Sequence, residues 1–228
     1  MMKRVSVLLG LLILIVGALS YHAARTEDAA GPTTITLPTP EFTSKVTVEE
    51  ALQQRRSVRA YAKEALTLQQ VSKLLWSAQG ITEPKRGLRT APSAMATYPL
   101  RVYLFAGNVA DLPAGVYRYI PQGHKLELVA AGDQRGNVGV QPTAINAPAD
   151  FLFTADTSAV AKRFGADTAK KFAYIEIGHA AQNVLLEEVA LNLVGVGMAG
   201  MDPAKMKTVL KLPDTEEPVY LLSAGKKA

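Results

Sequence analysis

Two segments of the chain combine apolar residues at helical spacing with a capping pattern at their start. Thr47 is followed three residues later by Glu50, and Thr67 is followed by Gln70 at the same spacing. In each pair the threonine hydroxyl can accept a hydrogen bond from the third helical amide, while the longer side chain reaches back to the threonine amide. We therefore expect one helix that ends around Arg55 and a second helix after Thr67. The second helix repeats apolar residues every three or four positions and stops at a glycine: Val71, Leu74, Leu75, Ala78 and Gly80.

The middle of the chain is rich in strand-forming residues. Residues 100–105 form one such run, and residues 149–154 form a short apolar run that suits a buried strand. Residues 115–120 and 125–129 flank the sequence Pro-Gln-Gly-His at 121–124, which is typical of a hairpin turn. The pattern predicts four strands here.

The last third of the chain returns to helical spacing. A long helix is expected from about residue 167 to 193, followed by a glycine-interrupted strand at 194–198. Asp202 and Pro203 have the residue types that favour the N-cap and first position of another helix, and residues 218–223 predict a closing strand. Helices and strands come in runs, so the predicted fold class is α+β, with helices packed on a central mixed or antiparallel sheet.

Composition removes several classes of site. The chain of 228 residues has no cysteine, which excludes disulfides, thiolate metal sites and cysteine nucleophiles. Its three histidines do not lie at a metal-ligand spacing, so no metal site is expected. The net charge of +5 is too mild to predict a nucleic-acid partner, and the sequence has no long basic stripe with interleaved aromatic residues.

The first twenty residues have the layout of a secretory signal. Lys3 and Arg4 precede residues 5–19, which carry no charge and are mostly Leu, Val and Ile. A permanent membrane helix normally needs about 20 apolar residues, and this run is shorter. Residues 1–20 are therefore expected to be a cleaved signal peptide, and an uncleaved N-terminal anchor is the alternative. Residues 21–45 are expected to form a flexible tether, and residues 46–228 the domain. The protein is therefore expected to be exported, either periplasmic or membrane-tethered and facing outside the cytoplasm.

One short segment concentrates positive charge. Arg55, Arg56, Ser57 and Arg59 lie within five residues just after the first predicted helix. Guanidinium groups match phosphate with paired donors, and serine adds a hydroxyl, so the segment could bind an anion. A solvated basic helix end is the alternative, since cations are favourable at a helix C-terminus. From these four residues alone the solvated helix end is the favoured interpretation.

The sequence Arg-Arg-Ser-Val-Arg-Ala-Tyr at 55–61, followed by Ala-Pro-Ser-Ala-Met-Ala-Thr-Tyr-Pro-Leu at 91–100, resembles the nitroreductase superfamily. The resemblance is strongest to the SagB-type (thiazole/oxazole) dehydrogenase-like branch. Each block alone is common, but together they follow the family's order and cover roughly residues 47–227. The further blocks lie at 116–119, 176–183, 198–202 and 221–226.

The resemblance implies a nitroreductase-like fold and an FMN cofactor at the interface of a homodimer, in which the long central helix pairs the subunits. Arg55, with Arg56 beside it, would contact the FMN phosphate or ribityl chain. Ser57 would donate a hydrogen bond nearby, and Lys226 would complete the phosphate site. Arg59 would approach the polar edge of the isoalloxazine, where positive charge stabilises the reduced flavin.

The resemblance also places small residues against the flavin ring. Pro92, Ser93 and Ala94 would pass along it, contributed by the partner subunit. Ala199 and Gly200 would present backbone groups close to the ring, where bulky side chains would prevent approach.

The implied activity is that of an FMN-dependent oxidoreductase. Hydride would pass through flavin N5 to or from a small organic substrate in a ping-pong scheme, with NAD(P)H as one candidate donor. Such chemistry needs no acid–base dyad. Pyridine nucleotides are scarce outside the cytoplasm, so the alternative is a non-catalytic FMN-binding or membrane-tethered interaction module of the same fold.

Three features bear on substrate and dimer. Relatives often carry glycine where this chain has Met95, so a flexible thioether is expected to narrow the substrate face. The chain ends at Ala228, so the C-terminal arm of many relatives is expected to be short, and the dimer to rest mostly on the long helix. His179 in that helix is interpreted as a packed or interface histidine, with a substrate or redox role as the alternative.

Overall fold

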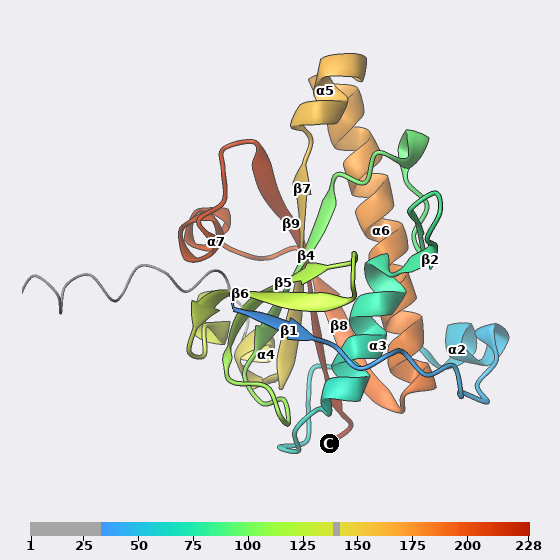
Figure 1. Ribbon diagram of the computed structural model, residues 1–228. Helices are drawn as coiled ribbons and strands as arrows, with labels where there is room; N and C mark the ends of the chain where they lie inside the picture. Colours follow the sequence, from blue (N-terminus) through green and yellow to red (C-terminus); the bar gives the residue numbers. More distant parts are fainter. Residues whose placement is uncertain (1–32, 139–141) are drawn as a thin grey trace, which may run out of the picture. The chain divides into compact units, whose positions relative to one another are not determined.

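Seven strands form one sheet in which every neighbouring pair is antiparallel (Figure 1). This computed structural model describes residues 33–138 and 142–228, and residues 34–228 form one unit. The predicted leader at 1–20 lies outside the described residues. In sheet order the strands are β1 (Thr34–Thr36), β6 (Lys125–Ala131), β5 (Gly115–Ile120), β4 (Leu100–Ala106), β7 (Ala149–Asp156), β9 (Glu216–Lys226) and β8 (Leu193–Met198).

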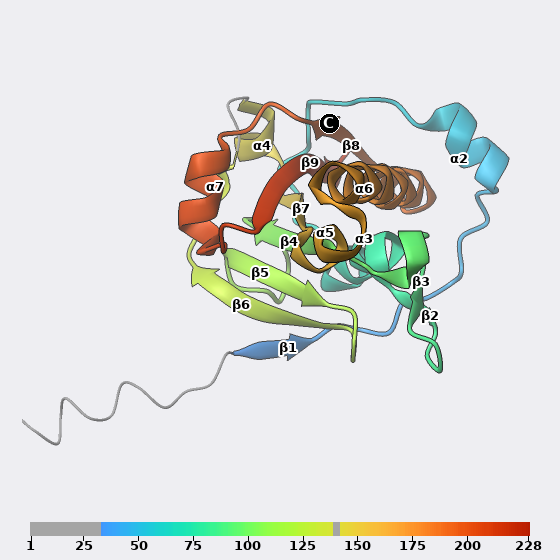
Figure 2. The same cartoon turned by 90° about the horizontal axis from the view of Figure 1, so that it is seen from above.

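Helices cover both faces of the sheet, as the view from above shows (Figure 2). α3 and α6 pack on one face, and α4 and α7 on the other. A separate two-stranded hairpin, β2 and β3, follows α3. The helices are α2 (Val48–Gln54), α3 (Leu68–Gln79), α4 (Pro142–Asn146), α5 (Ser158–Phe164), α6 (Ala166–Ala190) and α7 (Pro203–Leu210), and the hairpin strands are β2 (Ile81–Glu83) and β3 (Leu88–Arg89).

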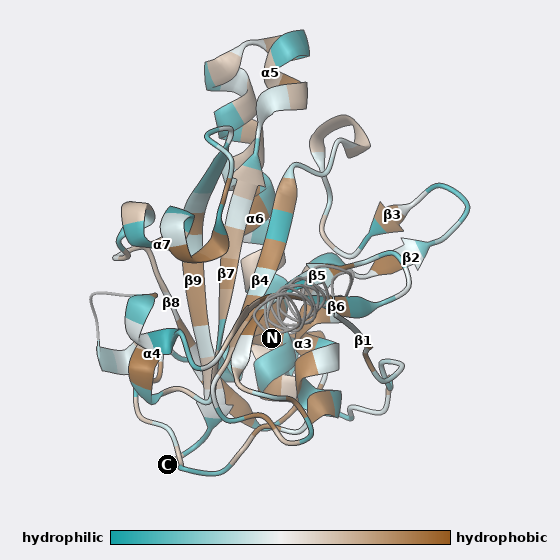
Figure 3. Cartoon of the chain, turned by 60° about the vertical axis from the view of Figure 1, so that its left-hand side comes forward, coloured by the Kyte–Doolittle hydropathy of each residue, from teal (hydrophilic) through white to brown (hydrophobic). Residues whose placement is uncertain are grey.

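Both faces of the central strands are apolar because helices cover each of them. On β4, Val102 and Leu104 join the core beneath α3 and α6, whereas Tyr103 and Phe105 join the core beneath α4 and α7. The hydrophobic colouring of β4, β7 and β9 in Figure 3 follows from this double burial. The structure confirms the predicted α+β class and the antiparallel form of its sheet.

The predicted caps are present. Thr47 accepts a hydrogen bond from the amide of Glu50 (3.2 Å), and the side chain of Glu50 accepts from the amide of Thr47 (2.8 Å). Thr67 and Gln70 form the same pair at the start of α3. Asp202 caps α7 by accepting from the amides of its first turn.

Two boundaries differ from expectation. The predicted tether over 21–45 is wrong for its described C-terminal part, because residues 34–36 form β1 and Leu37 is 4% exposed. The long helix ends at Ala190 rather than Leu193, since Asn192 has a positive φ of 55° and Leu193 already belongs to β8. The strand β1, the β2–β3 hairpin and helices α4 and α5 were not expected from the pattern.

In the part of the chain that is described, no helix combines the length and the apolar character needed to cross a bilayer.

A buried carboxylate joins three strands of the sheet. Glu216, at the start of β9, is fully buried. It accepts hydrogen bonds from Tyr103 (3.0 Å) and Thr154 (2.5 Å), and it pairs with Arg101. Its neighbour Glu217 is half-exposed and pairs only with surface groups on α6.

Replacing these adjacent glutamates should therefore have unequal effects. Glu216→Ala leaves three polar groups without their partner, and we expect it to lower the free energy of unfolding by about 3–5 kcal/mol. Glu217→Ala removes a surface ion pair and should lower it by less than about 1 kcal/mol. Urea denaturation of both variants measures the difference. Equal, small losses would contradict the assignment of Glu216 as a structural link between the strands.

Candidate functional site

The arginine-rich segment lies along the edge of the sheet because its backbone pairs with β8. α2 ends at Gln54, and Arg55 caps it by donating from its amide to the carbonyl of Ala51 (3.0 Å). The chain then runs extended. The amide of Val58 donates to the carbonyl of Gly195 (2.9 Å), and Ser57 pairs with Gly195 in a parallel bridge. These bonds hold the arginines beside β8.

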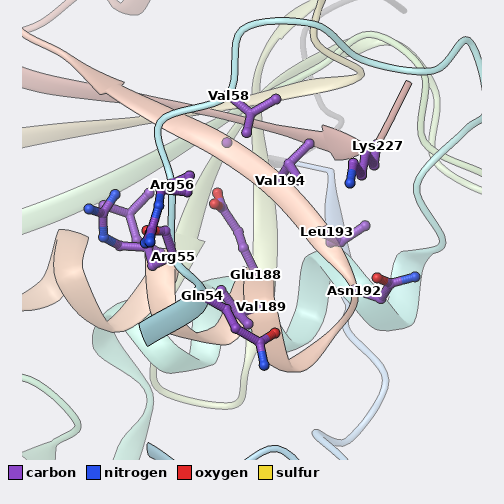
Figure 4. Close-up of a pocket in the computed structure, with 12 residues that line it drawn as sticks. Gln54, Arg55, Arg56, Val58, Glu188, Val189, Asn192, Leu193, Val194 and Lys227 are labelled. Atoms are coloured by element: carbon purple, nitrogen blue, oxygen red, sulfur yellow. The ribbon is translucent and has the colours of Figure 1, made fainter. Parts of the chain in front are cut away.

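A cavity of about 240 Å³ opens between this segment, the C-terminal part of α6 and the start of β8 (Figure 4). Three cationic side chains and one carboxyl group line it. Pockets that enclose a whole small molecule usually measure about 300–1,000 Å³. This cavity therefore suits one charged group, such as a phosphate. The lining residues are Gln54, Arg55, Arg56, Val58, Leu185, Glu188, Val189, Asn192, Leu193, Val194, Gly195 and Lys227.

The two arginines of the lining differ in their partners. The guanidinium of Arg56 folds back on the helix end, where it donates to the carbonyls of Gln53 (2.8 Å) and Arg55 (2.7 Å). These are carbonyls that the end of a helix leaves without an intrahelical partner. Among the described residues, none accepts a hydrogen bond from the guanidinium of Arg55. Arg55 is thus the lining arginine whose donors are available to an anion.

The C-terminal lysines divide between two environments. The ammonium group of Lys226 pairs with the carboxylate of Glu64 (2.7 Å), whereas Lys227 lines the cavity with the arginines. The role of Lys226 in completing a phosphate site stays a prediction, and in this structure its neighbour Lys227 is the lysine that lines the cavity. Alternation along the end of β9 sends successive side chains to opposite sides, so a shift of one residue changes which lysine faces the cavity.

The remaining predicted residues of the segment are exposed. Ser57 and Arg59 both face outward from the sheet edge. The charge of Arg59 lowers the pKa of Tyr61, although burial and the carboxyl groups of Glu188 and Asp150 raise that pKa more strongly.

A buried glutamate faces the cations across the cavity. Glu188 projects from α6 and is 2% exposed, and Figure 4 shows its carboxyl group pointing toward the arginine segment. Its Oε1 has no hydrogen-bond partner among the described residues. Burial raises the pKa of Glu188 from its ordinary value of 4.5 to about 8, although the charge of Arg55 opposes that rise. Around neutral pH this carboxyl group is therefore mostly protonated.

A second acidic group lies deeper under the same edge. Asp150 on β7 is fully buried and accepts a hydrogen bond from Ser223 on β9. Burial raises its pKa well above the ordinary value, against the lowering effect of that hydrogen bond. The charges of Glu188 and Asp150 both act on the side chain of Tyr61. Ser223 also forms a hydrogen bond with that side chain.

Pro92, Ser93 and Ala94 line a different cavity, of about 340 Å³, against the N-terminal half of α6. Ser93 donates a hydrogen bond that lowers the pKa of Glu176, while burial raises that pKa more strongly. His179 lines the same cavity and is exposed. Met95, just beyond, is 65% exposed with a φ of 56°.

A series of polar side-chain contacts connects the lining of this cavity to neighbouring elements. The Nε2 of Gln79 lies 3.4 Å from Oε1 of Glu176, and the guanidinium of Arg89 donates to Oε1 of Gln79 (2.6 Å). The Pro92–Ala94 turn is thus connected through Glu176 to the end of α3. Its geometry depends on α3 and α6 together.

Ala199 and Gly200 follow β8 and are exposed. Ala199 lines a third cavity, of about 380 Å³, with the middle of α6. The structure thus brings the arginine segment and Ala199–Gly200 to the two ends of one strand. It keeps Pro92–Ala94 apart from the arginines: Glu176 and Glu188, one beside each site, are 12 positions apart on α6, which corresponds to about 18 Å.

Two lining residues, Glu188 and Lys227, were missed from the sequence. For Glu188 a signal was present: it continues the face of α6 that Val184 and Leu185 define, and both of these are buried. A charged residue on the apolar face of a helix marks a group that needs a partner. For Lys227 no sequence signal was available, because nothing in the sequence distinguishes which of the adjacent lysines 226 and 227 faces the cavity.

Comparison with known proteins agrees with this geometry. The sequence profile of the Nitroreductase family matches residues 52–226. A protein named as a nitroreductase in Methanocaldococcus jannaschii is 32% identical over 193 residues, which are 80% of this chain and 92% of that protein. The crystal structure of a nitroreductase from Ralstonia eutropha superimposes with a TM-score of 0.77 at 30% identity, covering 88% of this chain and 96% of that one.

The fold is shared more widely. The Escherichia coli microcin synthetase McbBCD complex matches with a TM-score of 0.65 at 21% identity, over 90% of this chain and 86% of the matched one. The antiparallel sheet and the helices packed on it form a nitroreductase-like fold. The chain belongs to the Nitroreductase family, a family of oxidoreductases.

The raised pKa of Glu188 should be visible in the pH dependence of stability. In the unfolded chain this group loses its proton near pH 4.5, but in the folded chain it keeps the proton until about pH 8. Stability of the natural chain should therefore fall as pH rises from 4.5 to 8, by at most about 5 kcal/mol from this group. The Glu188→Gln variant has no carboxyl group to titrate at this position, so it does not lose this stability. The Tm of the variant relative to the natural chain should therefore rise from pH 5 to pH 8 and then stay constant.

Thermal denaturation between pH 5 and pH 9 measures this difference. Glu187→Gln is the matched control, because Glu187 lies next to Glu188 on the same helix and pairs with Lys73 (3.0 Å) away from the cavity. The control should show no such growth. A constant Tm difference between Glu188→Gln and the natural chain would contradict the assigned protonation.

Proposed function

We propose that this protein is an FMN-dependent oxidoreductase that acts on a small organic molecule. The observation that carries the proposal is the cavity at the edge of β8, where Arg55 presents guanidinium donors that no described residue accepts, beside Arg56 and Lys227. In a member of the Nitroreductase family, this cavity is the natural place for the cofactor phosphate.

The residues present fit FMN in size and charge. Three cations surround a space suited to one phosphate group, which carries nearly two negative charges at neutral pH. The flavin ring would then extend out of the cavity along β8, toward the exposed and small Ala199 and Gly200. When bound, FMN would supply hydride transfer, and the chain's own residues would hold its phosphate, orient its ring and limit access of water.

The exposed face of α6 supports a homodimer as part of this proposal. Tyr174 and Ile175 are 40% and 49% exposed, and Gly178 has no atom near the place of a Cβ. Their spacing of three and four residues makes one stripe along the helix, and the glycine lets a second helix approach closely. The exposed stripe consists of Lys171, Tyr174, Ile175, Gly178 and His179.

An antiparallel pairing of two such helices would complete the site. A two-fold axis near residue 180 would place the Phe172–Glu176 end of one helix beside the Leu185–Glu188 end of the other. Pro92–Ala94 of one subunit would then reach the arginine segment of its partner. This arrangement accounts for the roughly 18 Å that separates the two sets of residues within one chain.

The electron donor depends on the compartment in which the protein acts. NAD(P)H is the proposed donor if the enzyme acts where that nucleotide is present. Export, which the leader predicts, favours another reductant. The relationship to the SagB-type branch also remains a prediction, and the likeness to the microcin synthetase complex is one of fold.

Arg55→Ala should release the cofactor. Loss of a charged hydrogen bond to phosphate is worth about 1.5–3 kcal/mol, so we expect the Kd for FMN to rise about 10- to 100-fold. Quenching of flavin fluorescence on titration into the full-length chain measures it. Arg86→Ala is the control, because Arg86 is exposed far from β8 in the β2–β3 turn. Equal FMN affinity in both variants would refute the phosphate site.

The same preparation separates an enzyme from a non-catalytic flavin protein. An enzyme's bound flavin should lose its visible absorption on addition of dithionite or NADPH and regain it with a quinone or nitroaromatic. A flavin reduced by dithionite but never reoxidised by any acceptor would favour a binding module.

Ile175→Glu should disrupt the dimer. A carboxylate on the α6 stripe would be buried without a partner in the proposed helix pair, which is strongly unfavourable. We expect a monomer by sedimentation velocity. FMN affinity should also fall, because a monomer lacks the Pro92–Ala94 segment that the partner subunit would contribute to the site. Ile145→Glu is the matched control, since Ile145 on α4 is equally exposed (49%). A dimer that survives Ile175→Glu would locate the interface elsewhere.

A further inference from the structure

The carboxyl group of Glu188 occupies space that the absence of a side chain at Gly195 leaves at the sheet edge. It lies beneath Gly195, where a Cβ would overlap both its carboxyl oxygens and the carbonyl oxygen of Ser223. Any side chain at position 195 would therefore displace the glutamate or the strand. The buried carboxyl group and the glycine above it form one arrangement, and that arrangement faces the cavity of Arg55.

The titratable and charged groups around Glu188 come from several elements. The arginine segment supplies Arg55 and Arg56, and the end of β9 supplies Lys227. Tyr61 couples to Glu188 from the following segment, and it also couples to Asp150 on β7. β8 has no ionisable residue. On α6 itself the adjacent Glu187 faces Lys73 instead.

Glu188 and an incoming phosphate therefore compete for the same cation. No described residue forms a salt bridge with Glu188; burial raises its pKa, and the charge of Arg55 lowers it. If Glu188 carries a proton, Arg55 has no counter-ion among the described lining residues and its donors can bind the phosphate. If Glu188 is ionised, it neutralises Arg55 and repels a phosphate bound in the same cavity.

We propose that Glu188 is a proton-linked positioning residue of the cofactor site: binding of the FMN phosphate at Arg55 is coupled to uptake of one proton by the Glu188 carboxyl group. The proposal rests on the proposed function for the identity of the ligand. The balance is simple, because one proton moves from solvent to a carboxylate oxygen and no other bond changes.

The coupling has a definite sign. The phosphate stabilises the protonated form of Glu188, so the bound state holds the proton to higher pH than the free state. FMN affinity should thus be nearly constant below the pKa of about 8 and fall above it, by up to tenfold per pH unit. The phosphate of FMN is fully ionised in this range, because its second pKa is about 6.

The test is a titration of the full-length chain with FMN from pH 7 to pH 9.5. For the natural chain we expect the Kd to rise by about tenfold or more across this range. Glu188→Gln is the same size but always neutral, and its Kd should stay flat at the value that the natural chain has at pH 7. Glu187→Gln should follow the natural chain.

Calorimetry provides a measurement that needs no variant. Titrations at pH 8 in two buffers of different ionisation enthalpy report the protons taken up on binding. The natural chain should take up roughly half a proton, because about half of the Glu188 groups are ionised in the free state at that pH. A pH-independent Kd together with no proton uptake would overturn the proposal.

Failure of the proposed function would look different. If FMN binds at no pH, the flavin assignment is wrong, and sulfate replaces it as the probe because its charge is constant over this range. Stabilisation by sulfate that weakens above pH 8 in the natural chain, but not in Glu188→Gln, would still support the role of Glu188. Stabilisation by sulfate with the same pH profile in both proteins would overturn it.

Discussion

The contact between the arginine segment and the edge of β8 is the constraint on which the site depends. It rests on backbone hydrogen bonds, with the amide of Val58 donating to Gly195 (2.9 Å) and the amide of Ala62 donating to Lys226 (3.0 Å). Such bonds do not depend on the side chains of the segment, so the guanidinium of Arg55 can face a ligand while the backbone stays anchored. Gly195 has two functions at once, because its missing side chain leaves space for Glu188 and its carbonyl anchors the segment.

The length of α6 has the opposite effect, since it separates groups that one site would need together. Its 25 residues run from the Pro92–Ala94 turn to the arginine cavity. The buried residues of the helix fix it on the sheet, while the stripe through Gly178 stays exposed. A long helix with one face fixed and one face open favours a symmetric pairing, which would bring the separated groups together across the two-fold axis.

Much of the fold could be predicted from local patterns, because caps, turns and periodicity act over a few residues. The threonine caps at 47 and 67 and the hairpin at 121–124 are examples. β1 could not, since three residues of Thr-Ile-Thr gain their structure from pairing with β6. In the site, the arginine cluster was visible as a charge pattern. Glu188 and Lys227 were not, because their roles depend on which side of a helix or strand faces the cavity.

The route by which the chain reaches the domain also follows from the sheet order. Residues 34–37 pair with β6, where the amide of Leu37 donates to the carbonyl of His124 (3.0 Å), and Ser72 donates to the carbonyl of Pro38 (2.6 Å). β1 and β8 are the two opposite edges of a seven-stranded sheet, about 29 Å apart at the usual strand spacing. The described chain therefore enters the sheet at the edge away from the arginine cavity. An entry at β8 would compete with the segment that Gly195 anchors, whereas an entry at β1 leaves the edge at β8 to the arginines.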